Sequence, residues 1–181
     1  MQSMRWLMFK VGSLDREFPK TVDLMGYYIS LERHLAREYQ RLGDLAEDKF
    51  TSHLLHLMGK TSRKNASLLR EVFDELSNHG LVEQPTKVLN GWSNISPKMK
   101  QHMYTSDDLQ QSLRRYLAFE EYLKMEYHSM AEYFSSAAQN TGIPIFDSLS
   151  TVAENHEEYH HILKNLIKIS DVDKMLVSII G

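Results

Sequence analysis

The feature that most constrains the fold of this chain is a set of four long segments in which apolar residues recur at helical spacing. The four prolines stand at positions 19, 85, 97 and 144, outside these segments, and a proline inside a helix would break it. The periodicity predicts helices over residues 20–42, 45–77, 106–139 and 145–169 and a short fifth helix over 170–180. We therefore expect one all-α domain over residues 1–181, with its bundle core at about 20–169.

The connections predict how these helices are arranged. Gly43 indicates the end of the first helix, and Asp44 with Glu47 indicates a capping box that opens the second. A connection this short makes the two helices antiparallel neighbours. Residues 79–106 hold two prolines, two glycines and two asparagines, and a long connection of this kind indicates a crossover along the bundle. The expected fold is an antiparallel four-helix bundle with this crossover between its second and third helices.

Charge and composition exclude several classes of function. The net charge of -3 offers no basic surface for nucleic acid or for an anionic membrane. No apolar run approaches the roughly 20 residues that span a bilayer, and the N-terminus lacks the features of a signal peptide, so we expect a cytoplasmic protein. The chain has no cysteine, so any metal in it must be held by Asp, Glu or His.

The two halves of the chain resemble each other. Residues 28–39 (YISLERHLAREY) match residues 116–127 (YLAFEEYLKMEY). This match pairs Tyr28 with Tyr116, Glu32 with Glu120 and Tyr39 with Tyr127. Placing the second predicted helix on the fourth, with Leu54 on Leu149, sets Ser62 opposite Glu157 and Asn65 opposite His160.

Polar residues interrupt the apolar stripes near the middle of the predicted helices. Glu32 and Glu120 each lie on such a stripe, and a buried carboxylate needs a cation, a hydrogen-bond donor or a proton. Glu157 and His160 are three residues apart and share one helix face. Two glutamates with a Glu-x-x-His are the donors expected of an iron or manganese site in a bundle core.

The duplicated hairpin, the mid-helix glutamates and the segments TSRKNASLL (61–69) and EEYHHIL (157–163) resemble the rubrerythrin-like branch of the ferritin-like superfamily over about residues 20–169. The resemblance implies that Glu32, Glu120, Glu157 and His160 are metal ligands, with iron as the metal. Ser62 and Asn65 stand where that branch has a second Glu-x-x-His, which favours a single ion or none. In full-length rubrerythrins, the family that this chain resembles, such a bundle is joined to a Cys-ligated iron domain. This chain has no cysteine, so an external electron donor is expected.

Structural roles compete with metal binding at several of these positions. Lys64 lies close to the core face of its helix and offers an alternative cation for Glu32 and Glu120. His156, one turn before His160, is either an extra ligand or, more in keeping with its position, a hydrogen-bonded core histidine. We expect packing roles for the four duplicated tyrosines, a solvated face for Glu158 and His161, and a role at the end of the bundle for His53 and His56.

Two functions follow from these patterns. The first is a non-haem iron protein of ferritin-like type, an oxidoreductase that reduces peroxide or oxygen or oxidises ferrous iron. The alternative is a metal-free ferritin-like scaffold that acts as an interaction or assembly module, which Ser62, Asn65 and Lys64 favour. The apolar segment RWLMF (5–9) and the tail 170–180 are candidate subunit contacts, so we expect a homodimer.

Overall fold

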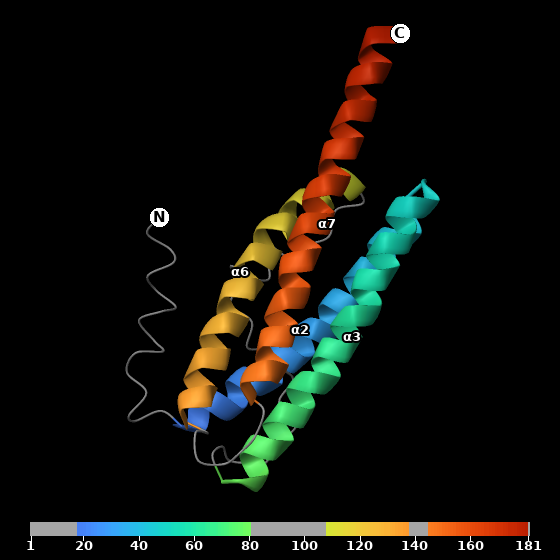
Figure 1. Cartoon of the computed structure of the whole chain (residues 1–181). Helices are drawn as coiled ribbons and strands as arrows, with labels where there is room; N and C mark the ends of the chain where they lie inside the picture. The colour runs from blue at the N-terminus through green and yellow to red at the C-terminus, as the bar shows by residue number, and fades with distance from the viewer. Residues whose placement is uncertain (1–17, 81–107, 138–144, 181) are drawn as a thin grey trace.

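The computed structural model describes the backbone of residues 18–80, 108–137 and 145–180, and the side chains of 25–80, 108–134 and 145–171. Every regular element in these ranges is a helix: α2 (Phe18–Leu45), α3 (Lys49–Asn78), α6 (Leu109–Ala137) and α7 (Ile145–Ile180) (Figure 1). The expected all-α class is confirmed for this part of the chain. The crossover expected over 79–106 stays a prediction, because residues 81–107 lie outside the described ranges.

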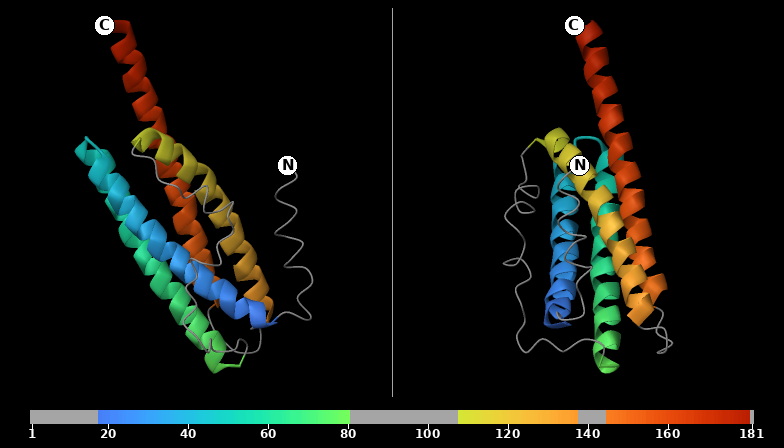
Figure 2. Two further views of the ribbon diagram at one scale, coloured as in Figure 1. Left: turned by 180° about the vertical axis from the view of Figure 1, so that it is seen from behind. Right: turned by 90° about the vertical axis from the view of Figure 1, so that its left-hand side faces the viewer.

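The helices pack as two hairpins placed side by side. The most extensive contacts join α2 to α3 and α6 to α7, and smaller ones join α3 to α7 and α2 to α6. Figure 2 shows the α2–α3 hairpin lying against the α6–α7 hairpin. The buried apolar side chains of all four helices form one core. None of the described helices combines the length and the apolar character that a membrane-spanning segment needs.

The turn between α2 and α3 differs from the prediction. The hydrogen bond from the Ala46 amide to the Leu42 carbonyl (3.1 Å) carries α2 past Gly43 to Leu45. Gly43 instead admits the ring of His56, which would lie 2.9 Å from a Cβ at this position. The cap of α3 is Asp48, whose carboxylate accepts from the Thr51 amide at 2.7 Å. The expected capping box of Asp44 and Glu47 is therefore wrong.

The end of α3 and the start of α6 agree with the capping residues in the sequence. The α3 helix ends at Asn78, and Gly80 follows with a φ of 68°, a conformation that glycine adopts at low cost. Asp108 accepts from the Gln111 amide at 3.2 Å and so caps α6. The connection between the helices predicted over 106–139 and 145–169, and residues 106 and 107 at the start of the first of these, lie outside the described ranges.

The fourth helix is longer than predicted. We expected a break near residue 169 and a separate fifth helix, but α7 runs without interruption to Ile180. Neither glycine nor proline occurs between Ile145 and Ile180, so nothing in the sequence stops the helix. Nη2 of Arg114 on α6 donates to both carboxylate oxygens of Asp171, at 2.7 and 2.8 Å, and so links α6 to α7 beyond the predicted end. The last turns of α7 extend past the rest of the bundle (Figure 1).

The core runs the length of the bundle and is lined by leucines, tyrosines and other large apolar side chains. Burying one such side chain contributes about 1.5–3 kcal/mol relative to leaving it exposed. Gly59 lets α2 and α3 approach closely, because a Cβ there would lie only 2.8 Å from the Ala36 carbonyl oxygen. This dry interior surrounds the few polar groups described next.

Candidate functional site: a buried Glu–His–Glu cluster

Three ionisable side chains meet in the middle of the bundle. Glu32 comes from α2, Glu120 from α6 and His156 from α7, and each is 0% exposed. Each stands on the apolar stripe of its helix, so folding carries all three into the interior together. Complete burial makes any unpaired charge among them costly by several kcal/mol or more, so their contacts decide what the site can do.

The imidazole of His156 lies between the two carboxylates. Its Nε2 is 2.7 Å from Oε1 of Glu32, and its Nδ1 contacts Oε2 of Glu120. An ionised carboxylate only accepts hydrogen bonds, so each of these contacts is best satisfied when the ring nitrogen carries a proton. The arrangement therefore fits an imidazolium that donates to both glutamates.

Two tyrosines complete the cluster. Tyr127 donates its hydroxyl proton to Oε1 of Glu32 at 2.7 Å, and Tyr39 donates to Oε1 of Glu120. The ring of Tyr127 also stacks on that of His156, with centroids 5.1 Å apart and planes 12° apart. We call Glu32, Glu120, His156, Tyr39 and Tyr127 the buried cluster.

A chain of amides joins the cluster to α3, the one helix that supplies none of its members. The Asn65 amide donates to Oε2 of Glu32 at 3.5 Å, at the long limit of a hydrogen bond. The carbonyl oxygen of Asn65 in turn accepts from the Asn155 amide at 2.7 Å. Both carboxylates thus receive neutral donors as well as the imidazole, and all four helices contribute to the network.

The electrostatics agree with this arrangement of protons. Burial acts to lower the pKa of His156, but the carboxylates of Glu32 and Glu120 oppose it and raise the pKa to about 10. Burial and the adjacent carboxylates raise the pKa values of Tyr39 and Tyr127 well above the ordinary tyrosine value. At neutral pH the histidine is therefore a cation and both tyrosines are hydrogen-bond donors.

The contacts repeat across the two halves of the chain, as the sequence match predicts. Tyr39 bonds to Glu120, and their partners in the match, Tyr127 and Glu32, bond to each other. The ring pairs agree as well. Tyr28 and Tyr127 lie 5.3 Å apart at 55°, and Tyr116 and Tyr39 lie 5.4 Å apart at 53°. The α2 and α6 segments are thus related by an approximate two-fold axis through the cluster.

The structure brings together two of the four residues that the sequence nominated as metal ligands. Glu32 and Glu120 face each other across His156. The Glu157 side chain is 46% exposed and pairs with Nζ of Lys124 at 3.0 Å. His160 is half-buried, and its Nδ1 faces the Leu117 carbonyl oxygen at 3.2 Å and Oε2 of Glu121 at 3.6 Å. Neither Glu157 nor His160 contacts the buried cluster through a described hydrogen bond or ion pair.

The reason is a one-residue error in the predicted register of the fourth helix. Leu54, which the prediction placed on Leu149, is only half-buried, whereas Leu55 is fully buried. Matching buried positions instead pairs Leu55 with Leu149, Met58 with Val152, Ser62 with His156, Asn65 with Tyr159 and Leu69 with Leu163. One residue turns a helix by about 100°. That rotation moves the Glu-x-x-His away from the cluster and puts His156 and Tyr159 in its place.

The donor set does not fit the predicted iron site. Both ring nitrogens of His156 face carboxylate oxygens, so neither offers a free lone pair to a metal. Within the described ranges, no group of three or more His, Asp or Glu side chains is arranged to hold a metal ion. The core-facing i, i+3 pairs on α3 and α7, namely Ser62 with Asn65 and His156 with Tyr159, contain no carboxylate.

Among the structural roles predicted in place of metal binding, the one for Lys64 is wrong and the one for His156 is confirmed. Lys64 is exposed, so the alternative that it is the cation for the glutamates is wrong, and His156 fills that role. The interpretation of His156 as a hydrogen-bonded core histidine is confirmed. Its place on the apolar stripe was the only sequence signal for it, because the partners that decide its role come from other helices. Glu158 and His161 are exposed, as expected.

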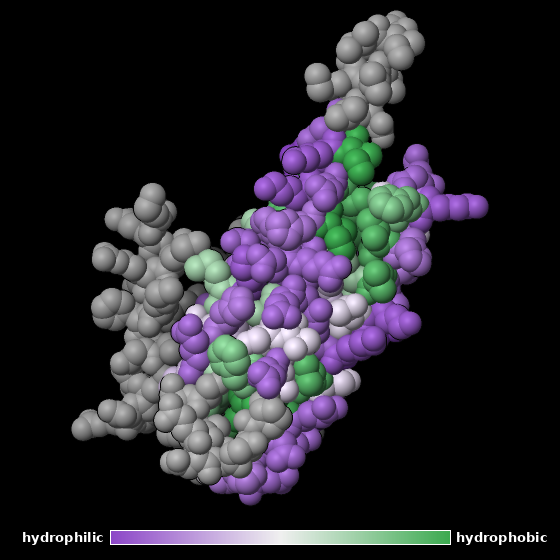
Figure 3. Space-filling model, in the orientation of Figure 1, coloured by the Kyte–Doolittle hydropathy of each residue, from purple (hydrophilic) through white to green (hydrophobic). Residues whose placement is uncertain are grey.

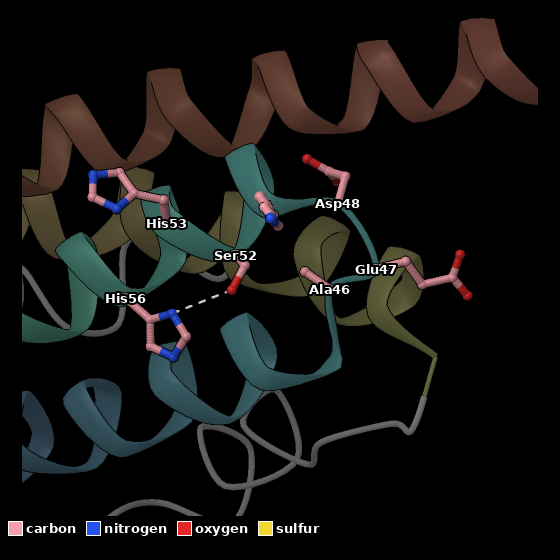
Figure 4. A pocket seen from close by; sticks show the side chains of 7 residues that line it. Ala46, Glu47, Asp48, Ser52, His53 and His56 are labelled. Carbon is pink, nitrogen blue, oxygen red and sulfur yellow. Dashed lines mark hydrogen bonds between the residues drawn. The ribbon is translucent and has the colours of Figure 1, made fainter.

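A second polar group lies at the turn between α2 and α3, as expected for His53 and His56. A surface hollow of about 330 Å³ is lined by Ala46, Glu47, Asp48, Lys49, Ser52, His53 and His56. His56 bonds to the Ser52 hydroxyl at 3.4 Å and to the Asp44 carboxylate at 3.0 Å. Figure 4 shows the rings of His53 and His56 well apart rather than converging on one point. This pair is therefore a feature of the end of the bundle and not a second ligand cluster.

The two tyrosine hydroxyls should contribute measurably to stability. Replacing Tyr39 or Tyr127 by phenylalanine removes a hydrogen bond to a buried carboxylate and should lower the free energy of unfolding by about 1.5–3 kcal/mol in each case. Tyr116→Phe is the matched control. The Tyr116 hydroxyl is buried and has no hydrogen-bond partner among the described residues, so little change is expected. Urea denaturation of the three variants tests this, and equal losses in all three would contradict it.

The buried cluster and the exposed turn are the two polar groups that the described residues offer as candidate sites. Only the cluster is shielded from solvent, and the hydrogen bond from Asn65 of α3 connects it to the one helix that supplies none of its members. Comparison with known proteins assigns neither group a role: no protein-family model, curated protein or solved structure matches this chain.

Proposed function

We propose that this chain is a metal-free ferritin-like scaffold that acts as an interaction or assembly module. The observation that carries the proposal is the position of the His156 imidazole, which bridges Glu32 and Glu120 through both ring nitrogens. The cation that two facing core glutamates require is supplied by the chain itself. A metal ion would have to displace that imidazolium before it could bind.

The residues around the imidazole support the same function. A di-iron carboxylate site in a bundle takes a Glu-x-x-His from each of two helices, and the corresponding core-facing positions on α3 and α7 hold serine, asparagine, histidine and tyrosine. The hydrogen bonds from Tyr39 and Tyr127 occupy carboxylate oxygens that a metal would use. The cluster is thus organised to hold four helices in one packing rather than to present an open coordination position.

A scaffold of this kind acts through its surface. Several large apolar side chains are exposed on the described helices: Leu45, Phe50, Leu57, Met125, Phe146 and Ile169. A rigid interior that fixes the relative positions of these side chains is what an assembly module requires. The cytoplasmic location expected from the sequence is part of this proposal.

Metal content tests the proposal. The full chain, purified without chelator and then incubated with ferrous iron, manganese or zinc, should retain far less than one ion per chain after desalting. The double variant His156→Glu/Tyr159→His is the positive control, because it places a Glu-x-x-His at the core-facing positions and should gain metal.

Two patterns of metal binding would contradict the proposal. Stoichiometric iron in the wild-type chain, lost in His156→Ala, would contradict the proposal and show that the histidine is a ligand. Stoichiometric iron lost in Glu157→Ala and in His160→Ala would instead support the iron site and the oxidoreductase activity that the family resemblance implies. Glu158→Ala, an exposed neighbour, controls for a general effect of surface charge.

A further inference from the structure

An apolar strip follows the line where α3 meets α7. We define the seam strip as Phe50, Leu54 and Leu57 of α3 with Ile162 and Ile169 of α7. Phe50 is 62% exposed, Leu57 46% and Ile169 51%, and the other two are half-buried. Figure 3 shows apolar surface gathered where α7 passes the first turns of α3. The strip is therefore a property of two helices together and not of one stray side chain.

Two hydrogen bonds establish which residues of the two helices are neighbours. Tyr159 of α7 donates to the Met58 carbonyl oxygen at 3.2 Å, and Asn155 donates to Asn65 at 2.7 Å. Residue numbers fall along α3 as they rise along α7, so the helices run in opposite directions here. Ile162 and Ile169, which follow Tyr159, accordingly lie toward Leu54 and Phe50. Single exposed apolar residues need no explanation, but a continuous strip marks a binding surface.

The charges beside the strip indicate what covers it. Glu47, Asp48 and Lys49 are exposed at the end of the strip near Phe50, with two acidic side chains to one basic, and Lys60 and Lys64 are exposed beyond Leu57. The midpoint between Phe50 and Leu57 along the chain, between residues 53 and 54, is also the midpoint between Glu47 and Lys60. A second copy turned end for end about that point sets Phe50 against Leu57, and Glu47 against Lys60. This is the self-complementarity that a two-fold interface requires.

We propose that the seam strip is the interface of a two-fold symmetric homodimer, with the axis beside His53 and Leu54. This partner assignment rests on the proposed scaffold function and names the chain's own second copy as what it assembles with. The proposed axis lies near one end of the bundle. The α3 helix of the second copy then continues past that end, alongside the last turns of α7, which extend beyond the bundle in Figure 1.

The oligomeric state of the full chain tests the assembly. Sedimentation velocity over a range of concentrations should show a dimer for the wild type. Phe50→Glu places a charge at the end of the strip, where the proposed dimer sets it against Leu57 of the second copy, and should weaken the dimer at least tenfold. Phe146→Glu is the matched control, because Phe146 is 50% exposed but lies at the opposite end of the described α7, and it should remain dimeric. Both variants should keep the helical circular dichroism of the wild type.

Cysteine cross-linking tests the orientation, and the chain has no cysteine of its own to interfere. His53→Cys puts one thiol beside the proposed axis, within the roughly 7 Å between Cα atoms that a disulfide bridges. Mild oxidation should convert most of this variant to a covalent dimer, whereas Phe146→Cys should stay monomeric on a denaturing gel.

Three results would overturn the proposal. They are a wild-type chain that stays monomeric at every concentration, a Phe50→Glu variant that dimerises as well as the wild type, and equal cross-linking at residues 53 and 146. A monomeric wild type that Phe50→Glu only makes less stable would show that the strip is covered within one chain. None of these outcomes alters the metal content, so a failed dimer and a failed metal-free scaffold are distinguishable.

Discussion

Replacing His156 by leucine is expected to lower the free energy of unfolding by about 3–5 kcal/mol at pH 7, the usual loss when one partner of a buried ion pair is removed. Glu32 and Glu120 are both 0% exposed, so the variant leaves two facing carboxylates without their shared cation. Leucine fills most of the ring's volume, which keeps the loss of packing small. Urea denaturation monitored by circular dichroism measures the change directly.

A triple variant separates the charge from the packing. Adding Glu32→Gln and Glu120→Gln to His156→Leu removes the unpaired charges, while Tyr127 and Tyr39 still find amide oxygens to which they can donate. Much of the lost stability should return, because burying two neutral amides costs far less than burying two unpaired carboxylates. A His156→Leu loss below about 1 kcal/mol, the size of an ordinary hydrogen bond, would contradict the charged bridge.

Raising the pH should weaken the wild-type fold through the same residue. The unfolded chain releases the His156 proton near pH 6.5, whereas the folded chain holds it with a pKa of about 10. A raised pKa in the folded state contributes stability that is fully present below pH 6.5 and is lost as the pH rises to about 10. At about 1.4 kcal/mol per pH unit for one proton, the free energy of unfolding should fall by about 4 kcal/mol across this window.

Urea midpoints at intervals between pH 6 and 10 measure this slope. The triple variant His156→Leu/Glu32→Gln/Glu120→Gln is the control, since it lacks the titrating group, and its stability should change much less over the same range. A wild-type stability that stayed level or rose between pH 6.5 and 9 would show that His156 does not hold a proton between the glutamates.

Most of the helical architecture could be predicted from the sequence because its signals are local. Long apolar stripes free of proline predict long helices wherever they occur, and Asp108 predicts its own cap through a contact three residues away. The predicted end of α2 at Gly43 failed for a tertiary reason: this glycine makes room for the His56 ring of the next helix. The continuation of α7 needs no such contact, because neither glycine nor proline interrupts residues 145–180.

The candidate site could be predicted only in part. The reason is that the α2 and α6 sequences can be aligned with each other more securely than those of α3 and α7. The α2 and α6 segments carry matching tyrosines and glutamates, which align them without ambiguity, so Glu32 and Glu120 were found. The α3 and α7 segments offered mainly aliphatic residues, and Leu54 and Leu55 serve almost equally well as markers. A shift of one residue was enough to select Glu157 and His160 in place of His156 and Tyr159. Only the burial of each side chain resolves it.

The most direct test of the central claim is the protonation state of the His156 ring, measured by nitrogen-15 NMR on protein labelled at histidine, with His156→Leu to assign the signals. We expect both ring nitrogens of His156 to carry protons at pH 8, where an ordinary histidine is neutral, and to release one only near pH 10. A His156 ring with an unprotonated nitrogen at pH 8, either free or bound to a metal, would contradict the account.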